Sequence, residues 1–333
     1  MHTFDFTTAG GTHMTDLKLG IALWSQASDW PSFLAAAQAA ERHGYDHVWT
    51  WDHIQAIFGD PDQPIFEGYT ALAAIAQATE RVRIGLFVGA NTFRNPGLAV
   101  KCLTTIDHIS GGRAIMGLGG AWFEHEHTSF GIDFGSGFGQ RLDWLAEATA
   151  GARVLLDGGE LTSAAGGRYA FDHLRTLPRP VQKHLPLMIG GGGEKKTLRI
   201  VAQYADIWNV FGTPDVLVHK DAVLRQHCSD VGRDPATIER SVGCKITIRG
   251  TEAEAERVRR DIMEHNRTPL ERVAGDATFW TGTPEQIAET IIAYRRIGFH
   301  TFLVEHPAPY DAETMETLIQ VVKPMVEAAP VPS

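Results

Sequence analysis

The stretch Leu185-Pro-Leu-Met-Ile-Gly-Gly-Gly-Gly-Glu-Lys-Lys-Thr-Leu-Arg-Ile-Val-Ala-Gln-Tyr-Ala-Asp206 indicates most directly how this chain folds. Its apolar first residues predict a short buried strand, the four glycines Gly190–Gly193 predict a tight turn, and the residues from Glu194 predict a helix. Glycines leave the backbone N–H groups of the turn free to face a ligand, and the helix start adds unpaired N–H groups and the positive end of its dipole. Lys195 and Lys196 add positive charge. The stretch therefore indicates a phosphate site, and a turn without ligand is the alternative. It has neither the ending of a P-loop nor the dinucleotide fingerprint.

The same alternation of strand-like and helix-like segments extends along the chain. Eight segments are predicted to be strands: Leu17–Leu23, Tyr45–Trp51, Val82–Val88, Arg113–Gly117, Leu187–Gly190, Asp206–Val210, Val242–Ile248 and Thr301–Val304. The segments between them carry apolar residues at helical spacing, as in the helices expected from Gln140 and from Pro284, the latter with Thr283 as its capping residue. Eight strand–helix units without a linker predict an α/β fold, a (β/α)8 TIM barrel, and a doubly wound open sheet is the alternative.

Three stretches are longer than ordinary connections. Ile54–Gly68 and Gly119–Gly139 follow predicted strands, so they are expected as loop insertions at the carboxyl face of the barrel, where active sites form. Gly159–His184 follows a helix and is expected to contain a small hairpin. Asn266–Gly282 lies before the helix expected from Pro284 and is the least readable part of the chain.

The composition limits the classes of protein to which this chain can belong. With 333 residues, 44% of them apolar and 21% charged, it is typical of an ordered globular protein. The net charge of −10 argues against nucleic acid or an anionic membrane as a partner. No apolar run is long enough for a membrane span, and no signal peptide is visible.

The ends of the chain and its cysteines lead to three further expectations. Residues 1–14 are polar and patternless, so they are predicted to be a disordered or tag-like extension, and residues 15–330 a single domain. Three widely spaced cysteines, Cys102, Cys228 and Cys244, fit a reducing cytoplasm better than a disulfide framework or a metal site. A cytoplasmic location is therefore expected.

The clearest candidates for chemistry follow the second predicted strand. Asp52 and His53 end it, and catalytic groups of a barrel lie at the carboxyl ends of strands. Histidine exchanges protons near neutral pH, and the aspartate can accept a hydrogen bond. A capping Asp beside a surface His is the alternative interpretation.

Polar residues also follow the third and fourth predicted strands. Asn91, Thr92 and Arg94 can bind a ring edge or an anion, although a proline-ended turn explains them as well. The run Glu124-His-Glu-His127 lacks the His-Glu-x-x-His spacing that places two metal ligands on one helix face, so no metal is expected. Glu126 is interpreted instead as an acid, a base or a structural anchor.

Tryptophans cluster near the predicted strand ends. Such residues are usually packing, but together near one barrel face they suit an apolar pocket for a flat ring. The candidates for a substrate pocket are Trp24, Trp51, Trp122 and Trp208, and Trp280 lies in a similar position.

Four segments in this order resemble the luciferase-like monooxygenase superfamily, and within it the branch that uses coenzyme F420, a deazaflavin. They are Tyr45-Asp-His-Val-Trp-Thr-Trp-Asp-His53, the run from Ile84-Gly to Asn91-Thr-Phe-Arg-Asn-Pro96, Gly117-Leu-Gly to Glu126, and the glycine turn with its helix up to Asp206. The resemblance extends from Leu17 to about Val326.

The resemblance implies a role for each matching position. His53 would be the proton-transfer residue, with Asp52 and Glu126 beside it, and the Phe87–Val88 peptide bond would be cis. The cofactor contacts implied are Asp52, Phe87, Val88, Gly89, Asn91, Thr92, Gly119, Gly190, Gly191, Gly192, Gly193 and Glu194. The deazaflavin-dependent sugar-phosphate dehydrogenases that the chain resembles carry a Glu soon after the fourth-strand glycines, where this chain has Trp122, and this departure argues against a sugar phosphate as substrate.

The function implied is a coenzyme F420-dependent oxidoreductase that moves a hydride between C5 of the deazaflavin and a small organic substrate, with a homodimer as the assembly typical of the family. One alternative is a reduced-FMN-dependent monooxygenase on the same fold, since the glycine turn would bind either cofactor. Another is a cofactor-binding protein without catalysis.

Overall fold

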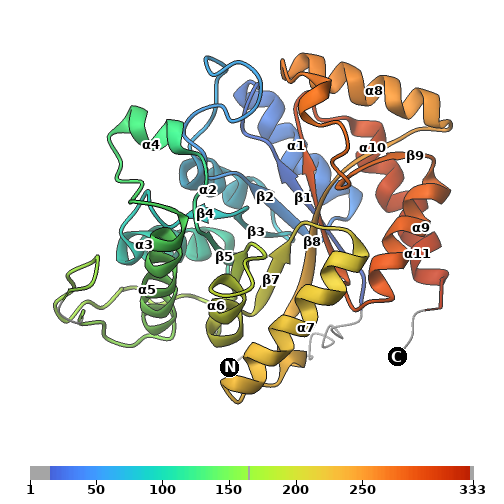
Figure 1. Ribbon diagram of the computed structural model, residues 1–333. Helices are drawn as coiled ribbons and strands as arrows, with labels where there is room; N and C mark the ends of the chain where they lie inside the picture. The colour runs from blue at the N-terminus through green and yellow to red at the C-terminus, as the bar shows by residue number, and fades with distance from the viewer. Residues whose placement is uncertain (1–15, 164–165, 331–333) are drawn as a thin grey trace, which may run out of the picture.

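The computed structural model describes residues 16–163 and 166–330 and shows a closed barrel of parallel strands surrounded by helices (Figure 1). The strands that close the barrel are β1 (Lys18–Leu23), β2 (His47–Thr50), β3 (Arg83–Leu86), β5 (Ala114–Gly119), β6 (Leu187–Gly190), β7 (Ile207–Val210), β8 (Glu239–Ile248) and β10 (Thr301–His306). Each pairs with the next in this order, and β10 returns to pair with both β8 and β1. The eight predicted strands and the TIM barrel are thereby confirmed, and the open sheet is excluded.

Two short strands lie outside this ring. β4 (Gly89–Ala90) pairs with β5, and β9 (Phe279–Gly282) extends the sheet along the second half of β8. β9 lies in the Asn266–Gly282 stretch, the least readable part of the sequence. The reason is physical: among the described strands β9 pairs with β8 alone and only every second residue is buried, so it lacks the continuous buried run of the four-residue strands of the barrel.

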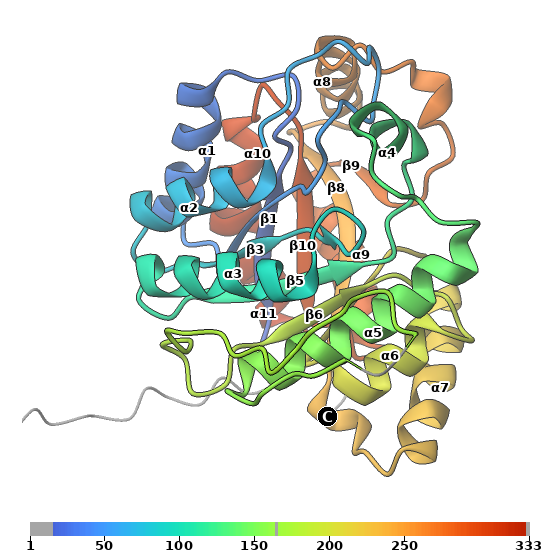
Figure 2. The same ribbon diagram turned by 90° about the vertical axis from the view of Figure 1, so that its left-hand side faces the viewer.

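Helices cover the outside of the barrel, and Figure 2 shows α1, α2, α3 and α5 arranged along one side. The helices are α1 (Trp30–His43), α2 (Gly68–Ala78), α3 (Pro96–Ser110), α4 (Glu124–Phe130), α5 (Phe138–Leu156), α6 (Thr197–Tyr204), α7 (Pro214–Asp230), α8 (Glu252–His265), α9 (Pro284–Arg295), α10 (Ala312–Thr317) and α11 (Lys323–Ala328). In the described part of the chain, none of them is long and apolar enough to cross a membrane.

Local sequence explains where several helices begin. Thr283 and Gln286 form a reciprocal capping box at the start of α9, as its Thr-Pro sequence predicts. The helix expected from Glu194 instead begins at Thr197, because residues 194–196 form a turn after the glycines. The expected hairpin in Gly159–His184 is present as an antiparallel pairing of Leu161 with Leu174.

The barrel interior is filled by large side chains, which require small neighbours. Trp49 is completely buried in a cluster that includes Trp24, Trp51 and Phe87. A Cβ at Gly85 would lie 2.3 Å from the Trp49 ring, so only glycine fits there. This packing fills the barrel below the carboxyl ends of the strands, where space remains.

The predicted extension at residues 1–14 lies outside the described residues.

Candidate active site

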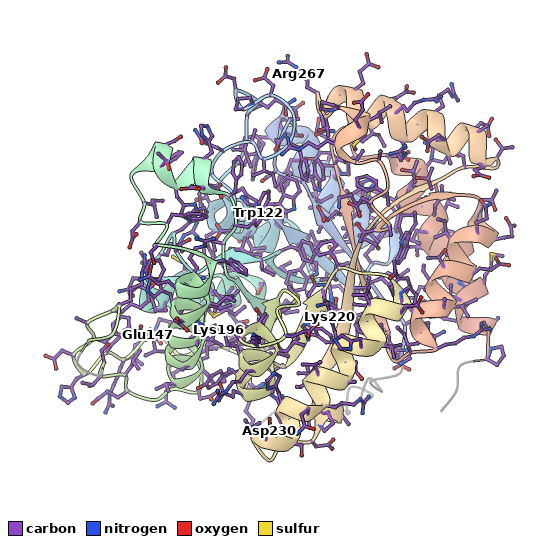
Figure 3. The ribbon with its side chains drawn as sticks, viewed as in Figure 1. Trp122, Glu147, Lys196, Lys220, Asp230 and Arg267 are labelled. Carbon is purple, nitrogen blue, oxygen red and sulfur yellow. The ribbon has the colours of Figure 1, made fainter. Side chains whose placement is uncertain are left out.

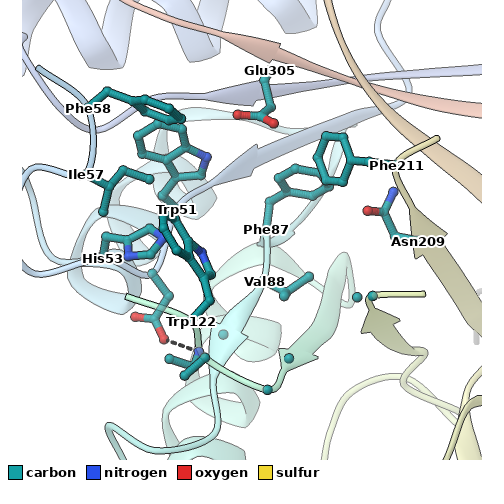
Figure 4. A pocket seen from close by; sticks show the side chains of 18 of the residues that line it. Trp51, His53, Ile57, Phe58, Phe87, Val88, Trp122, Asn209, Phe211 and Glu305 are labelled. Carbon is teal, nitrogen blue, oxygen red and sulfur yellow. Dashed lines mark hydrogen bonds between the residues drawn. The ribbon is translucent and has the colours of Figure 1, made fainter. Parts of the chain in front are cut away.

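A cavity of about 470 Å³ opens at the carboxyl ends of the strands (Figure 4). Its walls are mostly apolar, with Trp51, Phe58, Phe87 and Phe211 among the lining residues. Six titratable residues also reach it, in two groups. We call Asp52, His53 and Glu126 the His53 group, and Lys245, Asp276 and Glu305 the Lys245 group. An apolar cavity with a few convergent polar groups is the usual form of a site for a small molecule.

Within the His53 group, a carboxylate fixes the histidine ring. Nδ1 of His53 lies 2.9 Å from Oε1 of Glu126, whose other oxygen accepts a hydrogen bond from the Ile54 backbone N–H at 3.0 Å. Glu126 comes from α4 and is only 1% exposed. Because a carboxylate accepts, Nδ1 carries the proton. Nε2 then has no hydrogen-bond partner among the described residues and is available to the cavity.

Asp52 anchors the bend that follows β3. Its Oδ2 accepts hydrogen bonds of 2.8 Å from the Ala90 backbone N–H and from Nη1 of Arg94. Arg94 also bonds to Glu67 and lies over the Tyr69 ring. Burial alone would lower the pKa of Arg94, but the charges of Asp52 and Glu67 outweigh it and raise that pKa above its ordinary value. Asp52 therefore faces a permanent positive charge from behind the cavity wall.

The wall below the cavity is the bend between β3 and β4, and the Phe87–Val88 peptide bond in it is cis, as the resemblance implies. Val88 lies directly over two glycines of neighbouring strands. A Cβ at Gly119 would come within 2.6 Å of Val88, and one at Gly190 within 2.9 Å. We call Phe87 and Val88 the apolar ledge. Val88 can occupy this position only because Gly119 and Gly190 have no side chains.

The glycine turn after β6 offers unpaired backbone donors. Gly191 has a φ of +127°, a conformation that favours glycine. The amides of Gly192, Gly193 and Glu194 make no backbone hydrogen bond within the described residues. Lys220, on α7, bonds to the Gly192 carbonyl at 2.7 Å. Figure 3 labels Lys220 on α7.

Not every charge expected at this turn is free. Lys196 is engaged by Asp143 at 2.6 Å, and the Glu194 side chain lies 3.2 Å from Nε2 of His219. Of the glycines, Gly190 and Gly191 border the cavity, whereas Gly192 and Gly193 lie further along the turn. Lys220, which the sequence did not point to, brings a further cation to this turn, where its Nζ also lies 3.6 Å from Oε1 of Glu194.

The structure places the remaining predicted cofactor contacts around the cavity in different ways. Gly89 and Gly119 line it. Asn91 and Thr92 are buried behind it: Asn91 donates to the Gly119 carbonyl at 2.7 Å, and Thr92 bonds to Nε2 of His127 at 2.7 Å. Burial lowers the pKa of His127, so this ring is neutral and accepts from the threonine.

The predicted tryptophans divide in the same way. Trp51 and Trp122 line the cavity, and Trp122 is half-exposed at its mouth. Trp24 lies behind Trp51, with ring centroids 4.3 Å apart, and Trp208 is completely buried in the core with its Nε1 donating to Gly191. Trp280 packs against Tyr294. Two of the four predicted pocket tryptophans therefore border the cavity, and two support its walls.

The Lys245 group was missed by the sequence analysis. Its members come from β8, from the loop before β9 and from the end of β10, and no motif connects them. One signal was present: a lysine in the mostly apolar run Val242–Ile248 of a barrel strand needs a reason to be buried. Within residues 16–163 and 166–330, no cluster of His, Cys, Asp and Glu could hold a metal ion.

Comparison with known proteins gives both family and fold. A family model described as luciferase-like monooxygenase matches residues 1–301. An uncharacterized protein of Mycobacterium tuberculosis is 29% identical over 218 residues, which cover 60% of this chain and 74% of that protein. The pyrimidine monooxygenase RutA of Caulobacter vibrioides is 27% identical over 204 residues, covering 59% and 56% of the two chains.

Solved structures share the fold at lower identity. An F420-dependent secondary alcohol dehydrogenase, in complex with an F420–acetone adduct, superposes with a TM-score of 0.79 at 18% identity over 93% of this chain and 99% of that one. A type II Baeyer–Villiger monooxygenase from Pseudomonas putida, in complex with FMN, has a TM-score of 0.70 at 14% identity over 95% and 100%. The fold therefore occurs with either cofactor.

Proposed function

This chain belongs to the luciferase-like monooxygenase family, and on that premise we propose that it is a coenzyme F420-dependent oxidoreductase. The reaction is a hydride transfer between the deazaflavin and a small organic substrate, with His53 as the proton-transfer residue. The observation that carries the proposal is the His53–Glu126 pair, which holds a proton-transfer group against an apolar cavity.

The residues present fit a flat ring that carries a phosphate. Phe87, Val88 and the backbone of Gly191 would hold the ring, because the two side chains are apolar and the glycine has no side chain that would block it. The unpaired amides from Gly192 to Glu194, with Lys220 beside them, would hold the phosphate. These groups offset the overall negative charge of the chain locally.

When bound, the deazaflavin supplies the hydride chemistry at C5. The protein moves the accompanying proton. His53 exchanges it at Nε2, while Glu126 keeps the proton on Nδ1 and stabilises the ring when it becomes positively charged. The aromatic walls exclude water from this exchange. Asp52 holds the bend between β3 and β4 in place through Ala90 and Arg94, and it does not serve as an acid in the proposed reaction.

A reduced-FMN-dependent monooxygenase is the second candidate. RutA is named a monooxygenase, and a Baeyer–Villiger monooxygenase with the same fold has been solved in complex with FMN, which supports this candidate. The amides of the glycine turn would bind the phosphate of either group, so the turn does not distinguish them. The His53–Glu126 pair favours the deazaflavin, because a hydride transfer to an organic substrate needs one positioned proton.

The test is a fluorescence titration of the purified protein with coenzyme F420 and, separately, with FMN. We expect saturable binding of F420 at micromolar concentration or below, and FMN binding at least tenfold weaker. The variant Lys220→Met should weaken the binding of both, while Lys101→Met, remote from the cavity, should change neither. A preference for FMN would overturn the proposal in favour of oxygen-dependent oxidation, and binding of neither would contradict both candidates.

A further inference from the structure

The Lys245 group takes no part in the proton transfer, although it faces the same cavity as the His53 group. Lys245 on β8 and Glu305 on β10 are direct partners in the parallel pairing of these strands, so their side chains project to the same side, into the barrel mouth. Asp276 reaches the cavity from the loop before β9. Figure 4 shows Glu305 at the top of the view and His53 at the left.

Glu305 is held firmly, whereas Lys245 is not. Oε2 of Glu305 accepts a hydrogen bond from Nε1 of Trp24 at 2.9 Å, and both residues are buried. Nζ of Lys245 lies 3.3 Å from Oε1 of Glu305 and 4.0 Å from Oδ2 of Asp276, as ion pairs without hydrogen-bond geometry. The rings of Phe211 and Phe279 flank the ammonium, with centroids 5.5 and 4.6 Å away.

This arrangement leaves hydrogen-bonding capacity directed at the cavity. An ammonium has three N–H donors, and within the described residues Lys245 donates none of them in a hydrogen bond. Its side chain is only 10% exposed, so bulk water cannot satisfy them fully. Burying a charge without hydrogen bonds is costly, and an apolar residue at this strand position would avoid the cost. A ligand atom that accepts from Lys245 would offset it.

The charges of the group indicate what kind of ligand fits. Lys245 carries one positive charge, and Asp276 and Glu305 two negative ones, so the group is negative overall and disfavours an anionic head group. Oε1 of Glu305 has lone pairs left beside the ammonium, so the pair offers a donor and an acceptor side by side. The walls towards His53, which include Trp51 and Phe58, are apolar.

We propose that Lys245 and Glu305 form the substrate-recognition subsite of this cavity and select a neutral amide or lactam with an apolar body. The carbonyl oxygen accepts from Nζ of Lys245, and the adjacent N–H donates to Oε1 of Glu305. This assignment rests on the proposed function, because it takes the cavity to be where the substrate meets the cofactor.

The experiment measures equilibrium binding of four matched probes by ligand-observed NMR and tryptophan fluorescence, with F420-free protein and with F420-saturated protein. The probes are 3,4-dihydroquinolin-2(1H)-one, its N-methyl derivative, 1-tetralone and 2-naphthoate. They share an apolar bicyclic body and differ in the head group. We expect the lactam to bind at least tenfold more tightly than the N-methyl compound, which lacks the donor, and than the anionic naphthoate.

Two variants assign this preference to the subsite. Lys245→Met should lose at least tenfold in lactam affinity, and Glu305→Gln should narrow the gap between lactam and naphthoate about tenfold, because it removes the excess negative charge. The exposed Glu289→Gln on α9 is the matched control and should change nothing. Unfolding curves and F420 affinity check that each variant is folded.

The comparison of the four probes on the unaltered protein tests the inference even where a variant fails to fold. Equal affinities for all four, or naphthoate as the tightest ligand, would overturn the subsite, as would a lactam preference that survives in Lys245→Met. Failure of the proposed function has a different signature, namely the absence of F420 binding itself, and the measurements on F420-free protein still report on the subsite.

Discussion

The two polar groups that face the cavity are built in opposite ways. The His53 group is bound into the protein: Glu126 is tied to the backbone of Ile54, and Asp52 to the backbone of Ala90 and to Arg94. In the Lys245 group, the ammonium has ion pairs but no hydrogen bond within the described chain. A preorganised group is what a proton transfer needs, whereas spare hydrogen-bonding capacity is what ligand recognition needs. Changes to the first group should therefore affect turnover, and changes to the second should affect affinity.

The largest effect expected is that of His53→Ala. Turnover should fall about 10²- to 10⁴-fold, which is the usual contribution of a positioned acid or base, while F420 affinity stays within about twofold. Stopped-flow measurement of F420 oxidation or reduction with the best substrate from a screen of neutral carbonyl compounds checks this. Full turnover in the variant would contradict the role of His53 in proton transfer, and with it the assignment of turnover to the His53 group and of affinity to the Lys245 group.

A smaller loss is expected for Glu126→Gln, because Glu126 acts through His53 as a positioning residue. We expect kcat to fall about 10- to 100-fold, in line with the effect of misplacing a catalytic group by about 1 Å, with little change in KM. Glu126→Ala should lose more than the glutamine variant, which can still accept from Nδ1. A rise in KM with unchanged kcat would instead place Glu126 among the substrate contacts.

The third prediction concerns the ledge that both groups face. Gly119→Ala would put a Cβ 2.6 Å from Val88, so the variant should lose about 1–3 kcal/mol in its free energy of unfolding, as overpacked cores do. Urea unfolding measures this. Gly139→Ala is the control. Gly139 is exposed in the first turn of α5, and the nearest atom to an added Cβ is Nζ of Lys196 at 4.0 Å, so stability should stay equal or rise. Equal losses in both variants would show that the ledge does not depend on a close approach.

The same contrast explains what could be read from the sequence. The strands, the Asp52–His53 pair and the glycine turn were predictable, because Asp52 and His53 adjoin each other at the end of a strand and the glycines are consecutive. The contact of His53 with Glu126, 73 residues further along the chain, comes from the fold. The Lys245 group was not, because Lys245 and Glu305 are 60 residues apart and meet only through strand register. The roles of Trp24 and Trp208 behind the walls likewise depend on side-chain direction, which periodicity does not fix for tryptophans at strand ends.

The smallest effect expected lies in the outer support of the His53 group, where Glu67 caps α2 and pairs with Arg94. Burial tends to raise the pKa of Glu67, but hydrogen bonds from Thr70 and the charge of Arg94 outweigh it and hold that pKa below its ordinary value. A carboxyl whose pKa is lower in the folded state stabilises the fold above its unfolded pKa and loses that contribution as pH falls through the folded value.

Glu67→Gln should therefore destabilise the protein by about 0.5 kcal/mol at pH 7, a small figure because 39% of the glutamate side chain is exposed and its charge is screened. The difference from the unaltered protein should shrink as pH falls from 4.5, the ordinary pKa of a glutamate, through the lower pKa that Glu67 has in the folded protein, because the native carboxyl then becomes neutral as well. Urea unfolding at pH 7 and at the lowest pH at which the protein stays folded measures both values. Glu289→Gln should show the same small difference at each pH. A Glu67→Gln deficit that stays constant or grows on acidification would contradict a contribution from the charge of Glu67.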